Sequence, residues 1–220
     1  MLFGNGLSAL LTLFGISAAL VALFVIGPLL LAGGTPGSGW IRWLAYFGAL
    51  GAGFMLLEVA MLQRFVLLLG HPVYSLTVTL FSLLLGTGLG SVFSRVVDDH
   101  RIRRVTMSAL LAIVLVALVT RFAIPWLVDL AIPWPLDARI AMAIAILLPV
   151  GILLGMALPG GMRLLATQKP EIAPWGWGLN GAFSVVGATL AVFIAMNWGF
   201  STTFLAAAAV YAVAAAVFPK

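Results

Sequence analysis

Residues 44–91 read LAYFGALGAGFMLLEVAMLQRFVLLLGHPVYSLTVTLFSLLLGTGLGS and decide the fold of this chain. The stretch holds two long apolar segments joined by a Gly-His-Pro turn at residues 70–72. Each segment is long enough to cross a bilayer as a helix, because about 20 apolar residues suffice at a rise of about 1.5 Å per residue. The stretch therefore predicts two consecutive transmembrane helices, over residues 43–69 and 73–93.

One acidic residue, Glu58, lies deep in the first of these helices. An ionisable side chain at that depth costs about 2–3 kcal/mol, so it should face protein or a wet cavity. Arg64 follows six positions later and lies on a different face of the helix, so a partner for Glu58 must come from another helix. We favour a buried, hydrogen-bonded carboxyl group, and a proton- or ion-coupling role stays open as the alternative.

The second helix carries small residues on one face. They recur at steps of three or four positions and comprise Ser75, Thr79, Ser82, Gly86 and Gly90. Gly86 and Gly90 form a GxxxG pattern, and Gly151 and Gly155 form another one later in the chain. Because such patterns let two helix backbones approach closely, we interpret all of these residues as helix-packing residues.

The composition indicates an integral membrane protein. Hydrophobic residues make up 64% of the 220 residues and charged residues 8%, whereas soluble domains have about a quarter charged residues. The net charge of +5 does not indicate nucleic-acid binding, because the basic residues occur at helix ends and not in one patch. The absence of cysteine excludes disulfides and thiolate metal sites.

The pattern of apolar runs and turn residues predicts an all-α, polytopic transmembrane bundle of about seven helices in a single domain, residues 1–220. Glycine-rich residues 33–39 should connect the first two helices, and the proline- and tryptophan-rich residues 125–139 should lie along the membrane interface. Residues 159–161, Pro-Gly-Gly, should end the fifth helix. The predicted helices cover residues 7–32, 43–69, 73–93, 105–124, 140–158, 177–196 and 202–218.

Charge predicts the orientation of these helices. Eight basic residues fall on one side of the membrane, including a loop with Arg95, Arg101, Arg103 and Arg104, and three fall on the other. The positive-inside rule then places the N-terminus outside and the C-terminus in the cytoplasm.

A resemblance to a known family is carried by residues 54–91, FMLLEVAMLQRFVLLLGHPVYSLTVTLFSLLLGTGLGS, and by residues 173–192, APWGWGLNGAFSVVGATLAV. Both runs resemble the C-terminal membrane region of bacterial spermidine-synthase-like proteins, in which a polytopic membrane region is fused to an aminopropyltransferase-like domain. The resemblance implies a multi-pass protein of the bacterial inner membrane. This chain lacks the soluble catalytic domain, so the resemblance implies no catalytic residues here.

Few side chains could carry chemistry. His71 in the turn after the first long helix could be a ligand for a metal or pigment, although we favour a turn residue bonded to backbone. Asn180 and Ser184 share a face of the sixth helix, and we favour interhelical hydrogen bonding over a pathway for a small molecule or proton shared with Glu58. No nucleophile–base pair or set of acids for a metal is evident, so we expect no enzyme, no cofactor and no metal.

Three functions fit these observations. The preferred one is a non-catalytic, accessory subunit of a larger membrane complex, for example photosynthetic or respiratory, with other membrane subunits and the lipid bilayer as partners. The first alternative is a small proton- or ion-coupled permease that uses Glu58. The second alternative is the membrane half of a spermidine-synthase-like enzyme that needs a separate soluble partner.

Overall fold

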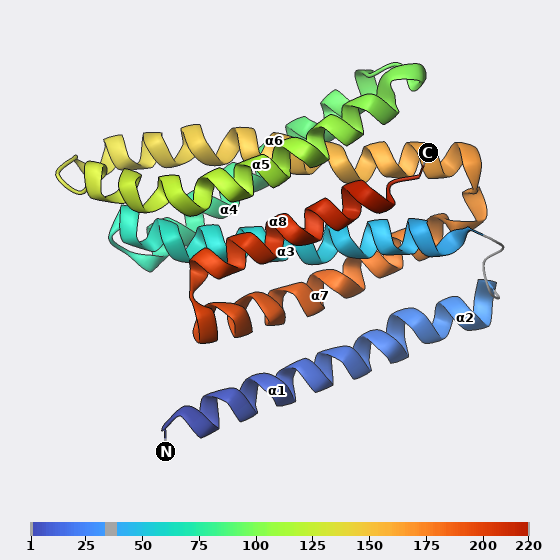
Figure 1. Cartoon of the computed structure of the whole chain (residues 1–220), viewed down its shortest axis with the longest axis horizontal. Coiled ribbons are helices and arrows are strands. Elements are labelled where there is room, and N and C mark those ends of the chain that lie inside the picture. Colours follow the sequence, from blue (N-terminus) through green and yellow to red (C-terminus); the bar gives the residue numbers. More distant parts are fainter. Residues whose placement is uncertain (1, 34–38, 220) are drawn as a thin grey trace.

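The computed structural model describes residues 2–33 and 39–219, and helices account for nearly all of them (Figure 1). Seven helices in this part are long and apolar enough to cross a membrane, so the prediction of seven is confirmed. Residues 34–38 of the predicted connector 33–39 and Lys220 lie outside the described residues. The helices are α1 (Leu2–Val21), α2 (Gly27–Gly33), α3 (Trp40–Leu69), α4 (Pro72–Val96), α5 (Asp99–Ala131), α6 (Leu136–Gln168), α7 (Ala173–Trp198) and α8 (Phe200–Val217).

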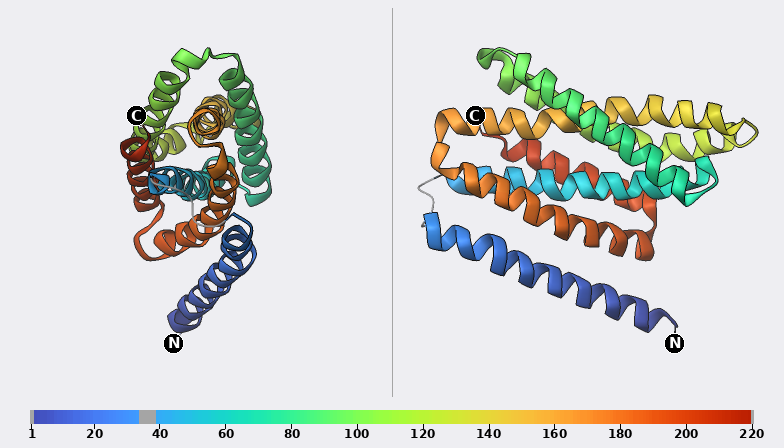
Figure 2. Two further views of the ribbon diagram at one scale, coloured as in Figure 1. Left: turned by 90° about the vertical axis from the view of Figure 1, so that its right-hand side faces the viewer. Right: turned by 180° about the vertical axis from the view of Figure 1, so that it is seen from behind.

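The first span, Ser8–Ile26, consists of most of α1 and a π-helical turn η1 (Ala22–Ile26), and α2 follows it directly. Pro28 explains the π turn, because its ring would clash with the carbonyl group four residues earlier in a regular α-helix. The Gly27 N–H bonds to the Ala22 carbonyl, five residues back, and this wider spacing relieves the clash. The span lies along one side of the bundle and contacts mainly α7, as Figure 1 and Figure 2 show.

The turn between α3 and α4 follows from three adjacent residues. Gly70 ends α3 with a φ of 75°, a left-handed conformation that glycine adopts without strain. His71 caps α4, since its Nδ1 atom accepts a hydrogen bond of 3.2 Å from the Val73 N–H. Pro72 then occupies the first helical position, where no N–H is needed.

Two helices, α5 and α6, continue through residues that were predicted to form connectors. Residues 125–131 were expected in an interfacial connector, but α5 continues through Pro125 to Ala131. Ile124, Val128 and Ala131 are all buried at helical spacing, so tertiary packing compensates for the hydrogen bond that Pro125 cannot make. Only residues 132–135 join α5 to α6.

The predicted end of the fifth helix at residues 159–161 is also wrong, because α6 runs on to Gln168. Gly160 and Gly161 are needed inside the helix: a Cβ atom at Gly160 would collide with the Thr106 hydroxyl, and one at Gly161 with the Tyr46 ring. These close approaches bury the helix on both sides and hold it together past Pro159. The two glycines that predict a helix end from the sequence allow close helix packing in the structure.

The charged segment 95–104, expected as a loop, is mostly helical as well. Its residues belong to the last turn of α4 and the first turns of α5, with only residues 97 and 98 between the helices. Arg163 of α6 holds this junction: it forms an ion pair with Asp99 and donates a hydrogen bond of 2.9 Å to the Val97 carbonyl. The Arg163 guanidinium satisfies carbonyl groups at the end of α4, so the junction needs no additional loop residues.

Arg139, at the start of α6, likewise bonds to a carbonyl group at a helix end, at the other end of the bundle. Its guanidinium donates to the Leu68 carbonyl in the last turn of α3 at 3.1 Å. Arg139 and Arg163 are 24 positions apart (163 − 139), which is about 36 Å along a helix. This distance slightly exceeds the hydrocarbon thickness of about 30 Å, as expected if one arginine lies near each membrane boundary.

The orientation of the bundle stays a prediction and can be measured. The native chain has no cysteine, so single thiols can be introduced at the exposed positions Asp98 and Asp129. Asp98→Cys should be protected from a membrane-impermeant maleimide in intact cells, and Asp129→Cys should be labelled from outside. Labelling of Asp98→Cys alone would show that the bundle is inserted the other way round.

Candidate functional site

The helices pair closely at two glycine-rich contacts. In α4 and α6, a Cβ atom at Gly86 would lie 2.6 Å from the Leu148 carbonyl oxygen, and one at Gly151 would lie 2.7 Å from the Leu83 carbonyl oxygen. Gly90 and Gly155 continue this contact, so both predicted GxxxG patterns face each other. The remaining small residues of the predicted α4 face, Ser75, Thr79 and Ser82, are buried too.

The second pair consists of α3 and α7. A Cβ atom at Gly187 would lie 2.7 Å from the Ala52 Cα atom, and one at Gly51 would collide with the Asn180 carbonyl oxygen. The Asn180 side chain adds a hydrogen bond of 3.2 Å to the Phe47 carbonyl. This is the interhelical bonding expected of Asn180. Ser184 instead donates to the Asn180 carbonyl within α7, at 2.9 Å.

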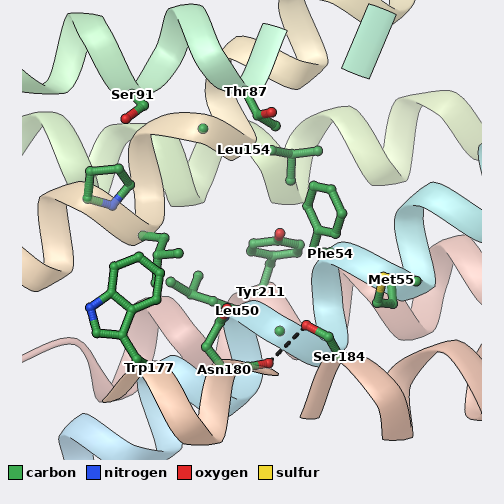
Figure 3. A pocket seen from close by; sticks show the side chains of 14 residues that line it. Leu50, Phe54, Met55, Thr87, Ser91, Leu154, Trp177, Asn180, Ser184 and Tyr211 are labelled. Atoms are coloured by element: carbon green, nitrogen blue, oxygen red, sulfur yellow. Dashed lines mark hydrogen bonds between the residues drawn. The ribbon is translucent and has the colours of Figure 1, made fainter. Parts of the chain in front are cut away.

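A cavity of about 410 Å³ lies between these two tight pairs. Figure 3 shows it with the side chains that surround it. Its volume falls in the range of about 300–1,000 Å³ that is typical of small-molecule sites. The lining residues are Leu50, Gly51, Phe54 and Met55 of α3, Thr87 and Ser91 of α4, Leu154, Gly155, Leu158 and Pro159 of α6, Trp177, Asn180 and Ser184 of α7, and Tyr211 of α8.

Tyr211 is the central polar group of this cavity (Figure 3). Its side chain is 1% exposed, and its hydroxyl group makes no hydrogen bond to any residue that the structure describes. Gly53 of α3 leaves room for the Tyr211 ring, because a Cβ atom at Gly53 would lie 2.8 Å from the Tyr211 Cε2 atom. A tyrosine hydroxyl buried in protein normally has a partner, so this one is free to bind something in the cavity.

Pro159 changes the backbone hydrogen bonding of α6 beside the cavity. Pro159 has no N–H, so the carbonyl group of Gly155 lacks the donor that normally lies four residues later. Both residues line the cavity.

Glu58 lies outside the lining of the cavity but close to it. Phe54 and Met55, which line the cavity, are one turn earlier on the same face of α3. The Glu58 side chain is 8% exposed, and it makes no hydrogen bond or ion pair with any described residue. The expected partner from another helix is therefore absent from the described part of the chain. Arg64 is engaged elsewhere, with the Ser201 hydroxyl at 2.6 Å.

The other predicted site residues lie apart from this cavity. His71 is at the opposite end of α4 from Ser91, in its capping position. Arg95, Arg101, Arg103 and Arg104 are at the α4–α5 junction and do not line the cavity. Within residues 2–33 and 39–219, no three histidine or acidic side chains lie close enough together to hold a metal ion.

The comparisons with known proteins add no further assignment. Neither protein-family models nor curated proteins nor solved structures give a match to this chain.

Sequence reasoning missed Tyr211, Ser91 and the role of Pro159. A signal existed for two of them. Tyr211 is the lone aromatic residue in the alanine-rich run 206–217, and Pro159 follows Gly155 by the four positions that leave a carbonyl unbonded. Ser91 gave no such signal, because its position depends on how α4 rotates against α6.

Proposed function

We propose that this chain is a small membrane protein of the permease type, which binds a small molecule in the cavity between the α3–α7 and α4–α6 pairs. The observation that carries the proposal is the free hydroxyl group of Tyr211 inside that cavity. Leaving a buried hydroxyl group unbonded costs about 1–3 kcal/mol, so a site that keeps one gains when a ligand or water bonds to it.

The lining has the mixed character of a ligand site. Leucine, methionine and aromatic side chains supply apolar contact, while Tyr211, Ser91 and Asn180 supply a few polar groups around the same space. Such a combination fixes the orientation of a small molecule that is otherwise held by apolar contact. The sequence alone narrowly favours the subunit interpretation, and the cavity is the reason to prefer the permease.

Glu58 supports coupling of this site to a proton or ion. Helical side chains lean toward the N-terminal end of their helix, so the Glu58 carboxyl group leans toward the turn that carries Phe54 and Met55. An unpaired acid at this depth is costly, and such residues commonly mark ion or proton pathways. We therefore assign Glu58 the coupling role and the cavity the binding role.

One observation favours a second candidate, an accessory subunit of a larger complex. None of the side chains described in the first span, Ser8–Ile26, is buried, and this span contacts mainly α7. A partner subunit could cover it. The mass of the native particle after mild solubilisation tests this candidate: a large hetero-complex favours the subunit, and a monomer or homodimer favours the permease.

The resemblance to spermidine-synthase-like membrane regions stays a proposal as well. It would make this bundle the membrane half of an enzyme with a separate soluble partner. Co-purification of a soluble aminopropyltransferase-like protein with the tagged chain would support it.

The binding role is tested by Tyr211→Phe. Loss of one hydrogen bond, about 0.5–1.5 kcal/mol, should weaken binding of a neutral probe two- to tenfold. A diazirine-bearing octanol, photo-crosslinked and competed with 1-octanol, measures this affinity. Tyr46→Phe is the matched control. Tyr46 does not line the cavity and donates a hydrogen bond of 2.6 Å to the Ala157 carbonyl, so its replacement should lower stability and leave probe affinity unchanged. Equal affinities of the wild type and Tyr211→Phe would refute the role of the hydroxyl.

The coupling role is tested by Glu58→Gln. Glutamine keeps the shape of the side chain but cannot release a proton, so the bundle should assemble and octanol should still bind. Release of the bound probe should then no longer respond to a proton gradient across the vesicle membrane. If the Glu58→Gln protein responds to the gradient as the wild type does, Glu58 has no coupling role.

A further inference from the structure

We infer that the ligand of this cavity is an uncharged amphipathic molecule that enters sideways from the bilayer, between α4 and α7. The inference rests on the proposed function and names the ligand class and the route of entry. It comes from the position of the polar lining residues relative to the membrane and from the charges around them.

The two helices that border the entrance hardly touch each other. α4 packs on α6 and α7 packs on α3, whereas α4 and α7 share almost no close approach. In Figure 3, Thr87 and Ser91 of α4 lie across the cavity from Trp177, Asn180 and Ser184 of α7. Four of these five side chains are half-buried and Trp177 is 58% exposed, so the space between the two helices is open at its side.

The depth of this opening places it against lipid. The α6 residues that line the cavity, 154–159, lie four to nine positions before Arg163, or about 6–14 Å along the helix. With Arg163 placed at one membrane boundary, the cavity lies within the hydrocarbon region on that side. Val92, next to Ser91 on α4, is 57% exposed, as expected of a lipid-facing side chain.

The absence of charge among the described lining residues indicates the class of ligand. None of the described residues that line the cavity is charged. Arg163, beyond one end of the cavity, is occupied by Asp99 and by the Ser94 and Val97 carbonyl groups. The lining therefore offers the hydroxyl groups of Thr87, Ser91 and Tyr211 among leucine, methionine and phenylalanine side chains. A neutral molecule with one hydrogen-bonding end and an apolar remainder matches it.

The route is tested with a fluorophore at the entrance. In vesicles, bimane on Ser91→Cys should lose most of its fluorescence to phospholipids with a nitroxide on the acyl chain and little to aqueous iodide. Bimane on Asp98→Cys, in the exposed junction of α4 and α5, is the control and should be quenched by iodide. Quenching of the Ser91→Cys label by iodide and not by nitroxide lipid would show that the cavity opens to water, which overturns lateral entry.

The ligand class is tested with three probes of equal chain length: 1-octanol, octanoate and octylammonium. Each competes with diazirine-bearing octanol for photo-crosslinking to the wild-type protein at matched membrane concentrations. Octanol should compete at concentrations at least about tenfold below those of either ion, since a charge at this depth is costly. Stronger competition by octylammonium or octanoate would overturn the uncharged class and leave the binding proposal standing. Failure of all three would refute both.

Discussion

Gly90→Leu should abolish the folded bundle, whereas Gly88→Leu, two residues away on the same helix, should be tolerated. A Cβ atom at Gly90 would collide with the Ile152 carbonyl oxygen of α6. Backbone cannot move aside as a flexible side chain can, so a leucine there must separate α4 from α6. Gly88 has open space where its Cβ atom would lie, and it is exposed.

The expected loss of folding free energy in Gly90→Leu exceeds about 1–3 kcal/mol, the usual cost of overpacking a core, because the contact is between two backbones. The measurement is the yield of monodisperse protein after detergent extraction, with thermal unfolding of whatever is recovered. Gly90→Leu should yield almost none, and Gly88→Leu should match the wild type. A stable, monodisperse Gly90→Leu protein would mean that α4 and α6 do not pack as described.

Ser91→Trp should eliminate binding of the octanol probe while leaving the bundle folded. Ser91 is half-buried at the entrance of the cavity and makes no hydrogen bond to a described residue, so its replacement removes no bond. The indole ring would occupy the space in which the ligand is expected to lie. We expect at least about a tenfold loss of specific photo-crosslinking, equivalent to about 1.4 kcal/mol.

Val92→Trp is the matched control for this variant. It adds the same side chain at the next residue of α4, where 57% exposure places it against lipid. Crosslinking should then stay at the wild-type level. Equal loss in both variants would assign the effect to a general disturbance of α4, and retention in both would show that the probe does not occupy the cavity.

The sequence predicts the number of spans because hydropathy reports directly on the solvent that surrounds a helix. It also predicts the α4 face, since the spacing of Ser75, Thr79, Ser82, Gly86 and Gly90 is a local property of one helix. All five residues are buried in the structure. Features that repeat along one helix can therefore be predicted from the sequence alone.

The helix ends were less predictable, because proline and glycine act as local stop signals that tertiary packing can override. Pro125 and Pro159 both lie inside helices that are buried around them. The cavity was not predictable at all: it exists only because two glycine contacts draw four helices into two pairs. Tyr211 becomes part of it because Gly53 lets its ring cross α3, a contact between residues far apart in the sequence.

The sites of photo-crosslinking show whether the space between the two helix pairs binds a small molecule. Wild-type protein in vesicles is irradiated with diazirine-bearing octanol, and the modified residues are identified by peptide mass spectrometry. We predict that adducts competed by unlabelled octanol concentrate on cavity residues from α3, α6 and α8, with Tyr211 and Leu154 prominent. Adducts spread over lipid-facing residues of α1 and α5, with no competed site in the cavity, would show that octanol does not bind between the helix pairs.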